Sequence, residues 1–338
     1  MAETVVVTGG GGYVGSVLVP KLLGRGHSVR VLDAFFYGDQ GLAPVRGHPN
    51  LEIYASDLRD RGTLEAALDG ATAVVHLASI SNDPSAELDP ILTQTVNYDA
   101  VVDLVGLARA AGVARLINAS SGSIYGVKEE EEVTEELVPA PMTLYAELKA
   151  RSEEPVRAAN DRNFATVSIR SATVCGYSPR MRLDLTVNLL TSLAVNRGRI
   201  TVFGGEQQRA NIHIDDITEL YALLVDVPPH RFSGEVFNAV GENHSVMAIA
   251  ETVREIVGSH IELERISTND HRSYRLSGAK LARALGFVAK HTIREAIVEV
   301  REAFEDGRLH GHDNPAYHNL VAMQALGFGR PRDRVSAR

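Results

Sequence analysis

Residues 4–15, TVVVTGGGGYVG, decide the fold of this chain. The first five residues form a β-branched run, which is typical of a buried strand, and the glycines after it stop the strand. Residues 13–23 carry the spacing of a helix, which ends at Gly24 and Gly26. A strand, a glycine-rich turn and a helix in this order predict the first βα unit of a dinucleotide-binding sheet.

The rest of the first half repeats this alternation. Strands that alternate with helices indicate βαβ units, and right-handed crossovers then wind helices over both faces of a parallel sheet. We therefore predict an α/β fold with a doubly wound parallel sheet of the Rossmann type. The predicted strands span 4–8, 28–33, 51–55, 73–77, 114–119 and 165–170, and the predicted helices 13–23, 61–68, 91–111 and 142–159.

The second half follows a looser pattern, which predicts a smaller mixed α/β lobe. Residues 1–172, with about 213–239, are assigned to the dinucleotide-binding domain. Residues 173–212 and 240–328 are assigned to a C-terminal substrate lobe, and 329–338 to a flexible polar tail. Helices are predicted over 184–196, 215–225, 246–257, 279–285 and 293–304, and strands over 200–203 and 235–239.

Charge and cysteine content exclude several kinds of partner. The 338 residues carry 34 Lys and Arg against 43 Asp and Glu, a formal net charge of −9. A chain this acidic repels a phosphate backbone, so we expect no nucleic-acid partner. The single cysteine, Cys175, excludes an internal disulfide and a cysteine-based metal site. We expect a cytoplasmic protein without membrane contact, because no apolar run approaches 18 residues and the first residues lack a signal-peptide pattern.

The glycine turn predicts a cofactor. Gly9, Gly12 and Gly15 permit a tight turn, let backbone N–H groups approach a diphosphate, and let the helix pack on the strand. Asp33 ends the second strand, 21 residues after Gly12. A carboxylate there accepts hydrogen bonds from an adenosine ribose and repels a 2′-phosphate, which favours NAD over NADP.

Tyr145 and Lys149 form the catalytic candidate. Their four-residue spacing places both on one face of the helix predicted over 142–159. A nearby ammonium favours the phenolate and so lowers the pKa of the tyrosine. Ser121 follows the fifth strand, at the edge where ligands bind in such sheets. We expect it to hydrogen-bond the oxygen that Tyr145 protonates or deprotonates.

These motifs together resemble those of extended short-chain dehydrogenase/reductases of the NAD-dependent epimerase/dehydratase family, which includes nucleotide-sugar epimerases similar to UDP-galactose 4-epimerase. The resemblance runs through nearly the whole chain in the family's order. It is carried by TGGGGYVG (8–15), Asp33, Asp57-Leu58, His76-Leu77-Ala78, Asn97, SSGSIYG (120–126), Tyr145 with Lys149, and RANIHIDD (209–216).

The resemblance implies further cofactor contacts. Backbone groups of Tyr13 and Val14 contact the diphosphate, and Asp57 and Leu58 contact the adenine. Lys149 binds the nicotinamide ribose in addition to tuning the tyrosine. The remaining implied cofactor residues are Leu77, Ala78, Ser79 and Asn97.

The resemblance also narrows the reaction. Family dehydratases have Thr-Asp-Glu after the fifth strand and family decarboxylases have a Glu there, whereas this chain has Ser121-Gly122-Ser123. The reactions that need a single acid/base remain. The leading hypothesis is a nucleotide-sugar 4-epimerase that oxidises C4 transiently, and the alternative is a 4-ketoreductase in deoxysugar synthesis. A non-catalytic NAD-binding relative ranks last, because Tyr145 and Lys149 are both present.

The implied substrate is a nucleotide diphosphate sugar, a UDP- or dTDP-hexose, and the implied assembly is a homodimer. Asn188 and Leu189 match the segment that contacts the base, and Arg209 and Arg272 match two diphosphate-binding arginines. Arg180 and Arg182 are further candidates for anion binding. Candidate sugar contacts are Ser81, Ser121, Ser123, Tyr145 and Thr173.

Two histidines receive structural interpretations. His213 with Asp215 and Asp216 could ligate a metal, but this pattern more often ends a strand and caps the next helix, so no metal is expected. His76 is interpreted as a buried histidine behind the cofactor site, with its hydrogen bonds satisfied.

Overall fold

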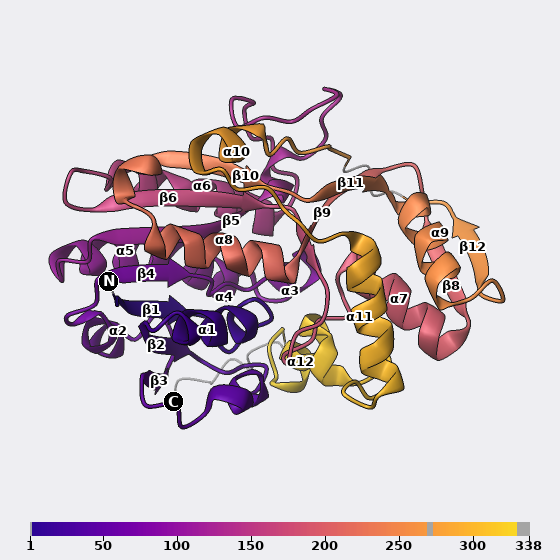
Figure 1. The fold of residues 1–338 in the computed structure, drawn as a ribbon, viewed down its shortest axis with the longest axis horizontal. Coiled ribbons are helices and arrows are strands. Elements are labelled where there is room, and N and C mark those ends of the chain that lie inside the picture. Colours follow the sequence, from indigo (N-terminus) through magenta and orange to yellow (C-terminus); the bar gives the residue numbers. More distant parts are fainter. Residues whose placement is uncertain (1, 269–272, 330–338) are drawn as a thin grey trace, which may run out of the picture.

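The computed structural model describes residues 2–268 and 273–329 and contains a seven-stranded sheet in the order β10-β6-β5-β4-β1-β2-β3. All of its strand pairs are parallel, which confirms the predicted α/β fold (Figure 1). Its strands are β1 (Thr4–Thr8), β2 (Ser28–Asp33), β3 (Leu51–Ala55), β4 (Ala73–His76), β5 (Arg115–Ser121), β6 (Ala165–Ser171) and β10 (Glu235–Ala239).

Helices cover both faces of this sheet because alternate strand residues point to opposite sides. In β1, Val5 and Val7 pack in one apolar cluster with α1 (Gly15–Gly24) and α8 (Ile214–Asp226). Figure 1 shows these two helices side by side in front of the sheet. Val6 packs in a second cluster on the other face. The helices of that face are α2 (Arg61–Leu68), α5 (Ala100–Ala110) and α6 (Leu144–Ala158).

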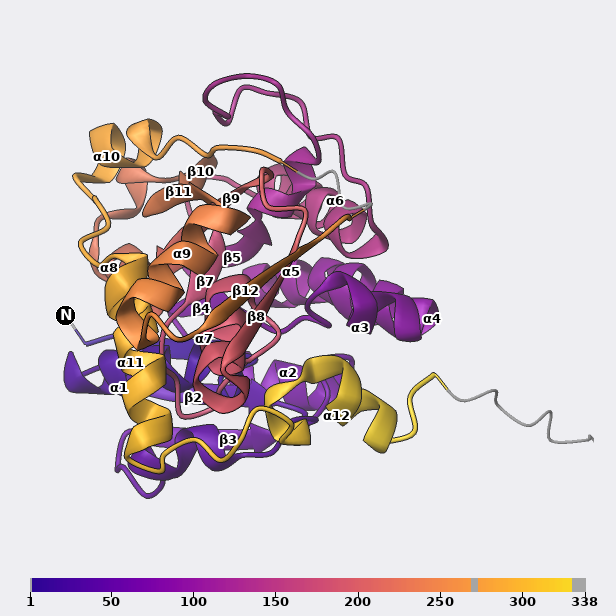
Figure 2. The same cartoon turned by 90° about the vertical axis from the view of Figure 1, so that its right-hand side faces the viewer.

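The smaller lobe lies beyond the carboxyl ends of the main strands, and Figure 2 turns it toward the viewer. It contains two small sheets, β11-β9-β7 and β12-β8. Its division from the main sheet into a separate domain remains a prediction. The elements are β7 (Thr173–Cys175), α7 (Thr186–Arg197), β8 (Arg199–Phe203), β9 (Gln208–His213), β11 (Glu242–Ser245), α9 (Val246–Val257), β12 (Glu262–Ile266) and α11 (Ile293–Glu305). Helix α10 (Ala279–Leu285) instead packs beside β10 of the main sheet.

The helix predicted over 91–111 is confirmed in extent, but it is not a regular α-helix throughout. It consists of α4 (Pro90–Gln94), a π-helical turn over Thr95–Asp99, and α5. The π turn brings the Asn97 amide to the Ile80 backbone, with N–H···O distances of 2.8 and 2.9 Å. A long-range contact of this kind leaves no helical signature in the sequence.

Two short helices each contribute a residue to the lining of the main cavity. They are α3 (Asp83–Leu88) and α12 (Asn319–Ala325), and neither was predicted. Met323 of α12 is fully buried with Ile80 and Leu92, so the C-terminal segment packs against the main domain. The tail predicted over 329–338 lies almost entirely outside the described residues.

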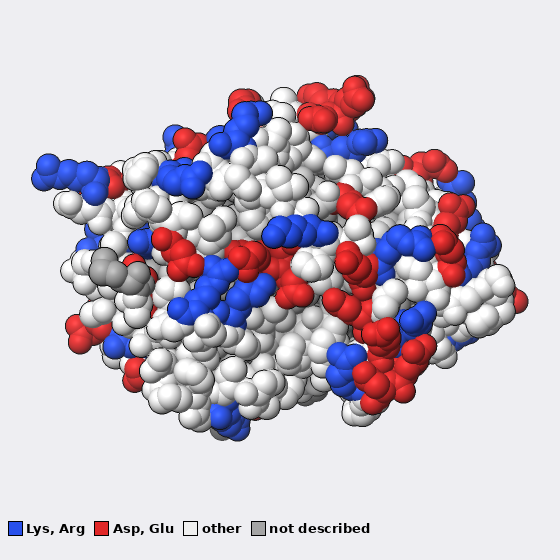
Figure 3. Space-filling model, viewed as in Figure 1, with Lys and Arg blue, Asp and Glu red and all other residues white. Residues whose placement is uncertain are grey.

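Charge on the face shown in Figure 3 is interspersed, and acidic side chains gather along one end of α11. Glu302 and Glu305 there form ion pairs with Arg301. Across the described ranges, none of the helices combines the length and the apolar character needed to cross a membrane.

Candidate active site

A cavity of about 380 Å³ lies at the carboxyl ends of the central strands and extends to the second lobe. It is lined by residues from the glycine turn, the ends of β2, β4 and β5, helix α6 and the segment after β6. The residues predicted from the sequence that line it are Gly9, Gly12, Tyr13, Val14, Gly15, Asp33, Asp57, Leu58, Leu77, Ala78, Ser79, Ser81, Ser121, Ser123, Tyr145, Lys149, Thr173, Arg182 and Arg209.

The glycine turn forms a bare backbone cradle. A Cβ at Gly9, where φ is +72°, would lie 2.6 Å from the Ala78 nitrogen, and one at Gly15 would lie 2.5 Å from the Gly10 oxygen. Glycine is therefore required at both positions. Helix α1 starts at this turn with no side-chain cap and no acidic residue in its first turn. Its N–H groups and partial positive charge suit a diphosphate, so the turn fits a dinucleotide.

Asp33 lies beside this cradle. Its carboxylate accepts hydrogen bonds from the Gly11 N–H at 2.9 Å and the Phe35 N–H at 2.7 Å. Burial raises the pKa of Asp33, and the two backbone hydrogen bonds act in the opposite direction. Phe35 adopts a φ of +51°, a costly conformation for a bulky residue, which turns the chain so that its N–H reaches Asp33. The carboxylate is thus held in place by the backbone.

Tyr145, Lys149 and Ser121 line the same cavity. Helix α6 starts where the Thr143 hydroxyl accepts a hydrogen bond from the Ala146 N–H, and this places Tyr145 in the first turn. The Lys149 Nζ donates to the Ala119 carbonyl at 2.8 Å and lies 6.0 Å from the centre of the Tyr145 ring. The Ser121 hydroxyl hydrogen-bonds that of Ser123 at 2.9 Å.

The electrostatics of Tyr145 differ from the expectation. Burial raises the pKa of its phenol, while the Arg182 charge and a hydrogen bond with Ser121 act to lower it. Burial also lowers the pKa of Lys149 to about 8, against the opposing charge of Glu153. The cation that acts most on the phenol in this structure is therefore Arg182 rather than Lys149.

Glu153 anchors the back of the site and was not predicted. It is one turn beyond Lys149 on α6 and accepts a hydrogen bond from the Ser120 hydroxyl at 2.6 Å. It also forms a buried ion pair with Arg170 at 2.8 Å. This network joins α6 to β5 and β6 directly behind the catalytic candidates. The signal available in the sequence was the continuation of the four-residue spacing from Tyr145 through Lys149 to Glu153.

Asp184 completes a polar wall that the sequence analysis also missed. Its carboxylate pairs with the Arg182 guanidinium at 2.9 Å and accepts a hydrogen bond from the Asn82 amide at 2.6 Å. Arg182 also donates to the Ser81 hydroxyl at 3.3 Å. Ser81 and Asn82 are far in the chain from Arg182 and Asp184, so no spacing pattern connects the two pairs.

Among the predicted ligand residues that the structure describes, those that do not line the cavity are Asn97, Asn188 and Leu189. Asn97 hydrogen-bonds the backbone of Ile80, which does line it, and a contact of Asn97 with the cofactor stays a prediction. The fully buried Asn188 amide is occupied by Gly176 and Tyr13. Base contact through the backbone of Asn188 and Leu189 stays a prediction. Arg272 falls outside the described residues.

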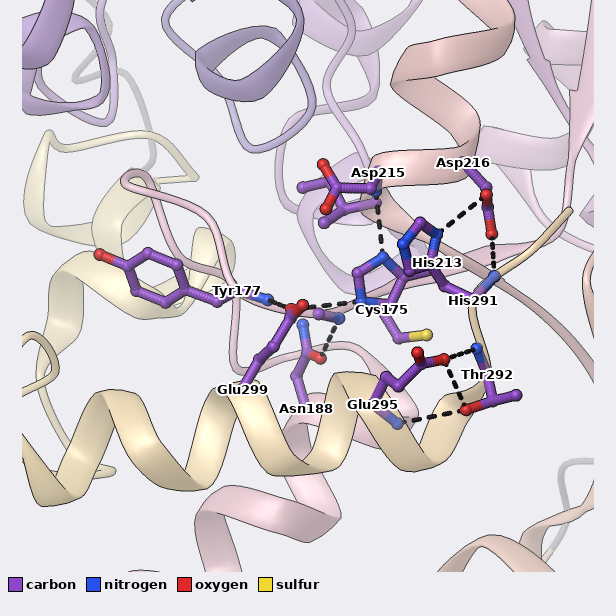
Figure 4. Close-up of polar contacts among 12 residues, drawn as sticks. Cys175, Tyr177, Asn188, His213, Asp215, Asp216, His291, Thr292, Glu295 and Glu299 are labelled. Carbon is purple, nitrogen blue, oxygen red and sulfur yellow. Dashed lines mark hydrogen bonds and ion pairs between the residues drawn. The ribbon is translucent and has the colours of Figure 1, made fainter.

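His213 caps helix α8, as the sequence interpretation had it (Figure 4). Its Nδ1 accepts the Asp215 N–H at 3.2 Å, so its Nε2 carries the hydrogen that faces Glu299 at 3.2 Å. His213, Asp215 and Glu299 are spaced closely enough for a metal ion. However, the cap uses the Nδ1 lone pair and leaves Nε2 protonated, so this tautomer offers no lone pair to a metal.

His76 matches its structural interpretation. Its Nδ1 hydrogen-bonds the Thr8 hydroxyl at 2.8 Å. Burial, with the charge of Lys149, lowers the pKa of His76 to about 3. The ring is therefore neutral at any working pH and supports the site from behind.

Comparisons with known proteins agree with this site. The model of the NAD dependent epimerase/dehydratase family matches residues 5–239. A UDP-glucuronic acid decarboxylase 1 from Xenopus tropicalis is 30% identical over 275 residues, which cover 78% of this chain and 63% of that relative. This chain thus spans less than two thirds of the frog protein's length.

Two relatives match over nearly their full length. A UDP-glucose 4-epimerase from Corynebacterium glutamicum is 27% identical over 319 residues, covering 88% of this chain and 94% of that protein. The structure of a Thermus thermophilus UDP-glucose 4-epimerase in complex with NAD is similar, with a TM-score of 0.76 and 27% identity. It covers 89% of this chain and 99% of that one. The fold is thus shared with a solved structure that contains NAD.

Proposed function

This chain belongs to the NAD-dependent epimerase/dehydratase family, and from that premise we propose that it is a nucleotide-sugar 4-epimerase acting through transient oxidation at C4 of the sugar. One observation carries the proposal. Tyr145, Ser121 and Lys149 converge in the cavity that holds the glycine cradle, while positions 122 and 123 supply no second acid or base. Inversion of the configuration at a single carbon through its ketone needs only one side chain that takes and returns the hydroxyl proton.

NAD, which the cradle and Asp33 fit, supplies when bound the site that accepts and returns a hydride. Tyr145 takes the proton from the C4 hydroxyl and later returns it. Ser121 hydrogen-bonds the same oxygen and so fixes its position. Lys149 holds the ribose side of the cofactor and adds positive charge that favours the phenolate. Arg182, the cation that acts most on Tyr145, supports the same proton transfer.

Two further carboxylates that line the cavity already have hydrogen-bond or ion-pair partners in the protein. Asp184 is bound to Arg182 and Asn82, and Asp83 accepts a hydrogen bond from the Thr143 hydroxyl at 2.7 Å. Their placement in these contacts favours a supporting role over removal of water or carbon dioxide. Elimination and decarboxylation each need a further group at the reacting carbons.

For the substrate we propose a UDP- or dTDP-hexose. Arg209 on β9 lines the cavity, and a guanidinium there offers bidentate bonds to a diphosphate. Ser81, Ser123 and Thr173 line the same space and present hydroxyls to a sugar. A homodimeric assembly and a cytoplasmic location remain predictions.

The test is to incubate the purified protein with UDP-glucose, UDP-galactose and their dTDP counterparts in D₂O, with NAD in catalytic amount, and to follow C4 by NMR. We expect interconversion of one 4-epimeric pair with no deuterium at C4, because the hydrogen on that carbon does not exchange with solvent. A requirement for stoichiometric NADH would assign the alternative, a 4-ketoreductase. Release of carbon dioxide from UDP-glucuronic acid would replace both assignments.

A further inference from the structure

Arg180 is distinguished among the buried arginines of the described residues because no carboxylate lies within ion-pair distance of it, although Asp33 and Asp184 act on its charge from farther away. Arg170 pairs with Glu153 at 2.8 Å and Arg182 with Asp184 at 2.9 Å. A further buried arginine, Arg115, lies 3.6 Å from Glu3 and donates to three main-chain carbonyls. Arg180 is only 2% exposed, and in the part of the chain that the structure describes it forms no ion pair with a carboxylate.

The contacts of Arg180 leave donors unused. Its Nη2 donates to the Asn319 amide oxygen at 2.5 Å, and its guanidinium lies 4.2 Å from the centre of the Tyr37 ring. Its Nε has no hydrogen-bond partner, and neither has the buried hydroxyl of Tyr37. Both residues line the main cavity. Buried polar groups normally have partners, so two orphaned donors beside one cavity point to an absent acceptor.

Arg180 also starts beside the glycine turn. The Ser178 hydroxyl donates to the Tyr13 carbonyl and contacts the Ser16 hydroxyl, each at 2.7 Å, so this segment is fastened to the first turn of α1. A Cβ built on Gly41 would lie 3.0 Å from the Arg180 Cβ and 3.1 Å from the Gly11 oxygen. Arg180, which comes from the second lobe and forms no ion pair in the described structure, thus starts at the edge of the glycine turn.

We propose that Arg180, assisted by Tyr37, is a second-lobe ligand of the NAD diphosphate, which the glycine turn binds from the main domain. A diphosphate supplies the acceptors that the guanidinium and the phenol lack, and its charge compensates the buried cation. Burial, together with the charge of Arg182, lowers the pKa of Arg180 to about 10, against the opposing charges of Tyr37, Asp184 and Asp33. The proposal goes beyond the sugar reaction, because it holds for any chemistry at C4.

The experiment uses full-length protein freed of nucleotide, with calorimetric binding of ADP-ribose, adenosine and UDP. In Arg180→Met, we expect ADP-ribose to bind roughly ten- to a hundredfold more weakly, the usual cost of one charge-assisted contact. Adenosine, which has no phosphate, and UDP should bind as to the unmodified protein. Tyr37→Phe keeps the ring under the guanidinium and should weaken ADP-ribose less.

Thermal unfolding without nucleotide separates this role from a structural one. Removal of an unpaired buried charge should leave the melting temperature of Arg180→Met unchanged or raised. Arg308→Met is the matched control, because Arg308 lies over the Tyr177 ring at 4.5 Å but is paired with Asp306 outside the cavity. It should leave ADP-ribose binding unchanged.

Three results overturn the proposal. The first is unchanged ADP-ribose binding in Arg180→Met. The second is a loss confined to UDP, which would assign Arg180 to the diphosphate of the nucleotide sugar. The third is a melting temperature lowered without nucleotide while ADP-ribose affinity is kept, which would make Arg180 a brace for Asn319. None of these results depends on whether the chain epimerises a sugar.

Discussion

The Arg182 guanidinium donates two hydrogen bonds to the Asp184 carboxylate, from Nε to Oδ1 at 2.9 Å and from Nη2 to Oδ2 at 3.2 Å. Both side chains are largely buried, and Asp184 also accepts from Asn82. The pair therefore holds the strongest cation near Tyr145 in a defined orientation. The orientation of this guanidinium at the cavity wall therefore depends on the Asp184 carboxylate.

Asp184→Asn tests this dependence. Loss of one partner leaves a buried guanidinium unpaired, which costs about 3–5 kcal/mol in other proteins. We expect a clearly lowered melting temperature, and a smaller loss in Asp184→Asn/Arg182→Met, where no lone charge remains. A double variant that is no more stable than the single one would show that the pair does not govern stability here.

Tyr145→Phe tests the acid/base assignment. The ring and its packing remain, but the group that moves the C4 proton is gone, so kcat should fall by about 10²–10⁴-fold with the fold intact. Ser121→Ala should lower kcat less. The double variant should lose less than the product of the two single effects, because both groups act on one oxygen. Turnover retained in Tyr145→Phe would move the proton transfer to another residue.

The charge of Lys149 sets a pH limit. Burial lowers the pKa of Lys149 to about 8, so the ammonium that we propose holds the cofactor is lost as the pH rises through that value. We expect kcat/KM and NAD affinity to decline above about pH 8. Lys149→Arg, which stays charged, should move this decline to higher pH. An identical upper limb in both proteins would assign the decline to another group.

The lowered pKa of Lys149 also makes the folding stability depend on pH. The pKa of Lys149 in the folded protein, about 8, is below its ordinary value of 10.5. Between these pH values the unfolded chain binds more protons than the folded one, so the contribution of Lys149 to folding stability increases with pH. Chemical denaturation of the unmodified protein and Lys149→Met across this range measures the difference.

Asp33 should determine cofactor choice. A 2′-phosphate beside its carboxylate suffers like-charge repulsion in a partly desolvated site. We expect NADP to bind at least about tenfold more weakly than NAD, or about 1.4 kcal/mol, and Asp33→Asn to narrow the gap. Calorimetric dissociation constants for both cofactors on both proteins decide the point. Equal affinities in the unmodified protein would contradict the assignment.

Arg209→Ala should affect substrate binding more than chemistry. Removal of a charge-assisted contact to a diphosphate costs about 1.5–3 kcal/mol, or roughly ten- to a hundredfold in affinity. KM for the nucleotide sugar should rise by that factor while kcat changes little. An unchanged KM would remove Arg209 from the diphosphate site.

The sequence by itself determined the sheet and the cofactor end. The strands over 4–8, 28–33, 51–55 and 235–239 were predicted with the bounds that the structure shows. Hydrophobic periodicity and glycine positions are local properties, so they can be read without the fold. The glycine turn, Asp33 and the Tyr145–Lys149 pair were visible for the same reason, because each lies within a single element.

The tertiary structure alone decided the π turn at Asn97, the Arg182–Asp184 wall and the unpaired state of Arg180. Each depends on partners from distant segments: Ile80 for Asn97, Asn82 for Asp184, and Asn319 for Arg180. A sequence shows that an arginine is present, but only the packing of its neighbours determines whether its charge is compensated. For that reason the motifs predicted the position of the cofactor site. The partners of the buried charges at that site, such as Arg180 and Arg182, became visible only in the folded chain.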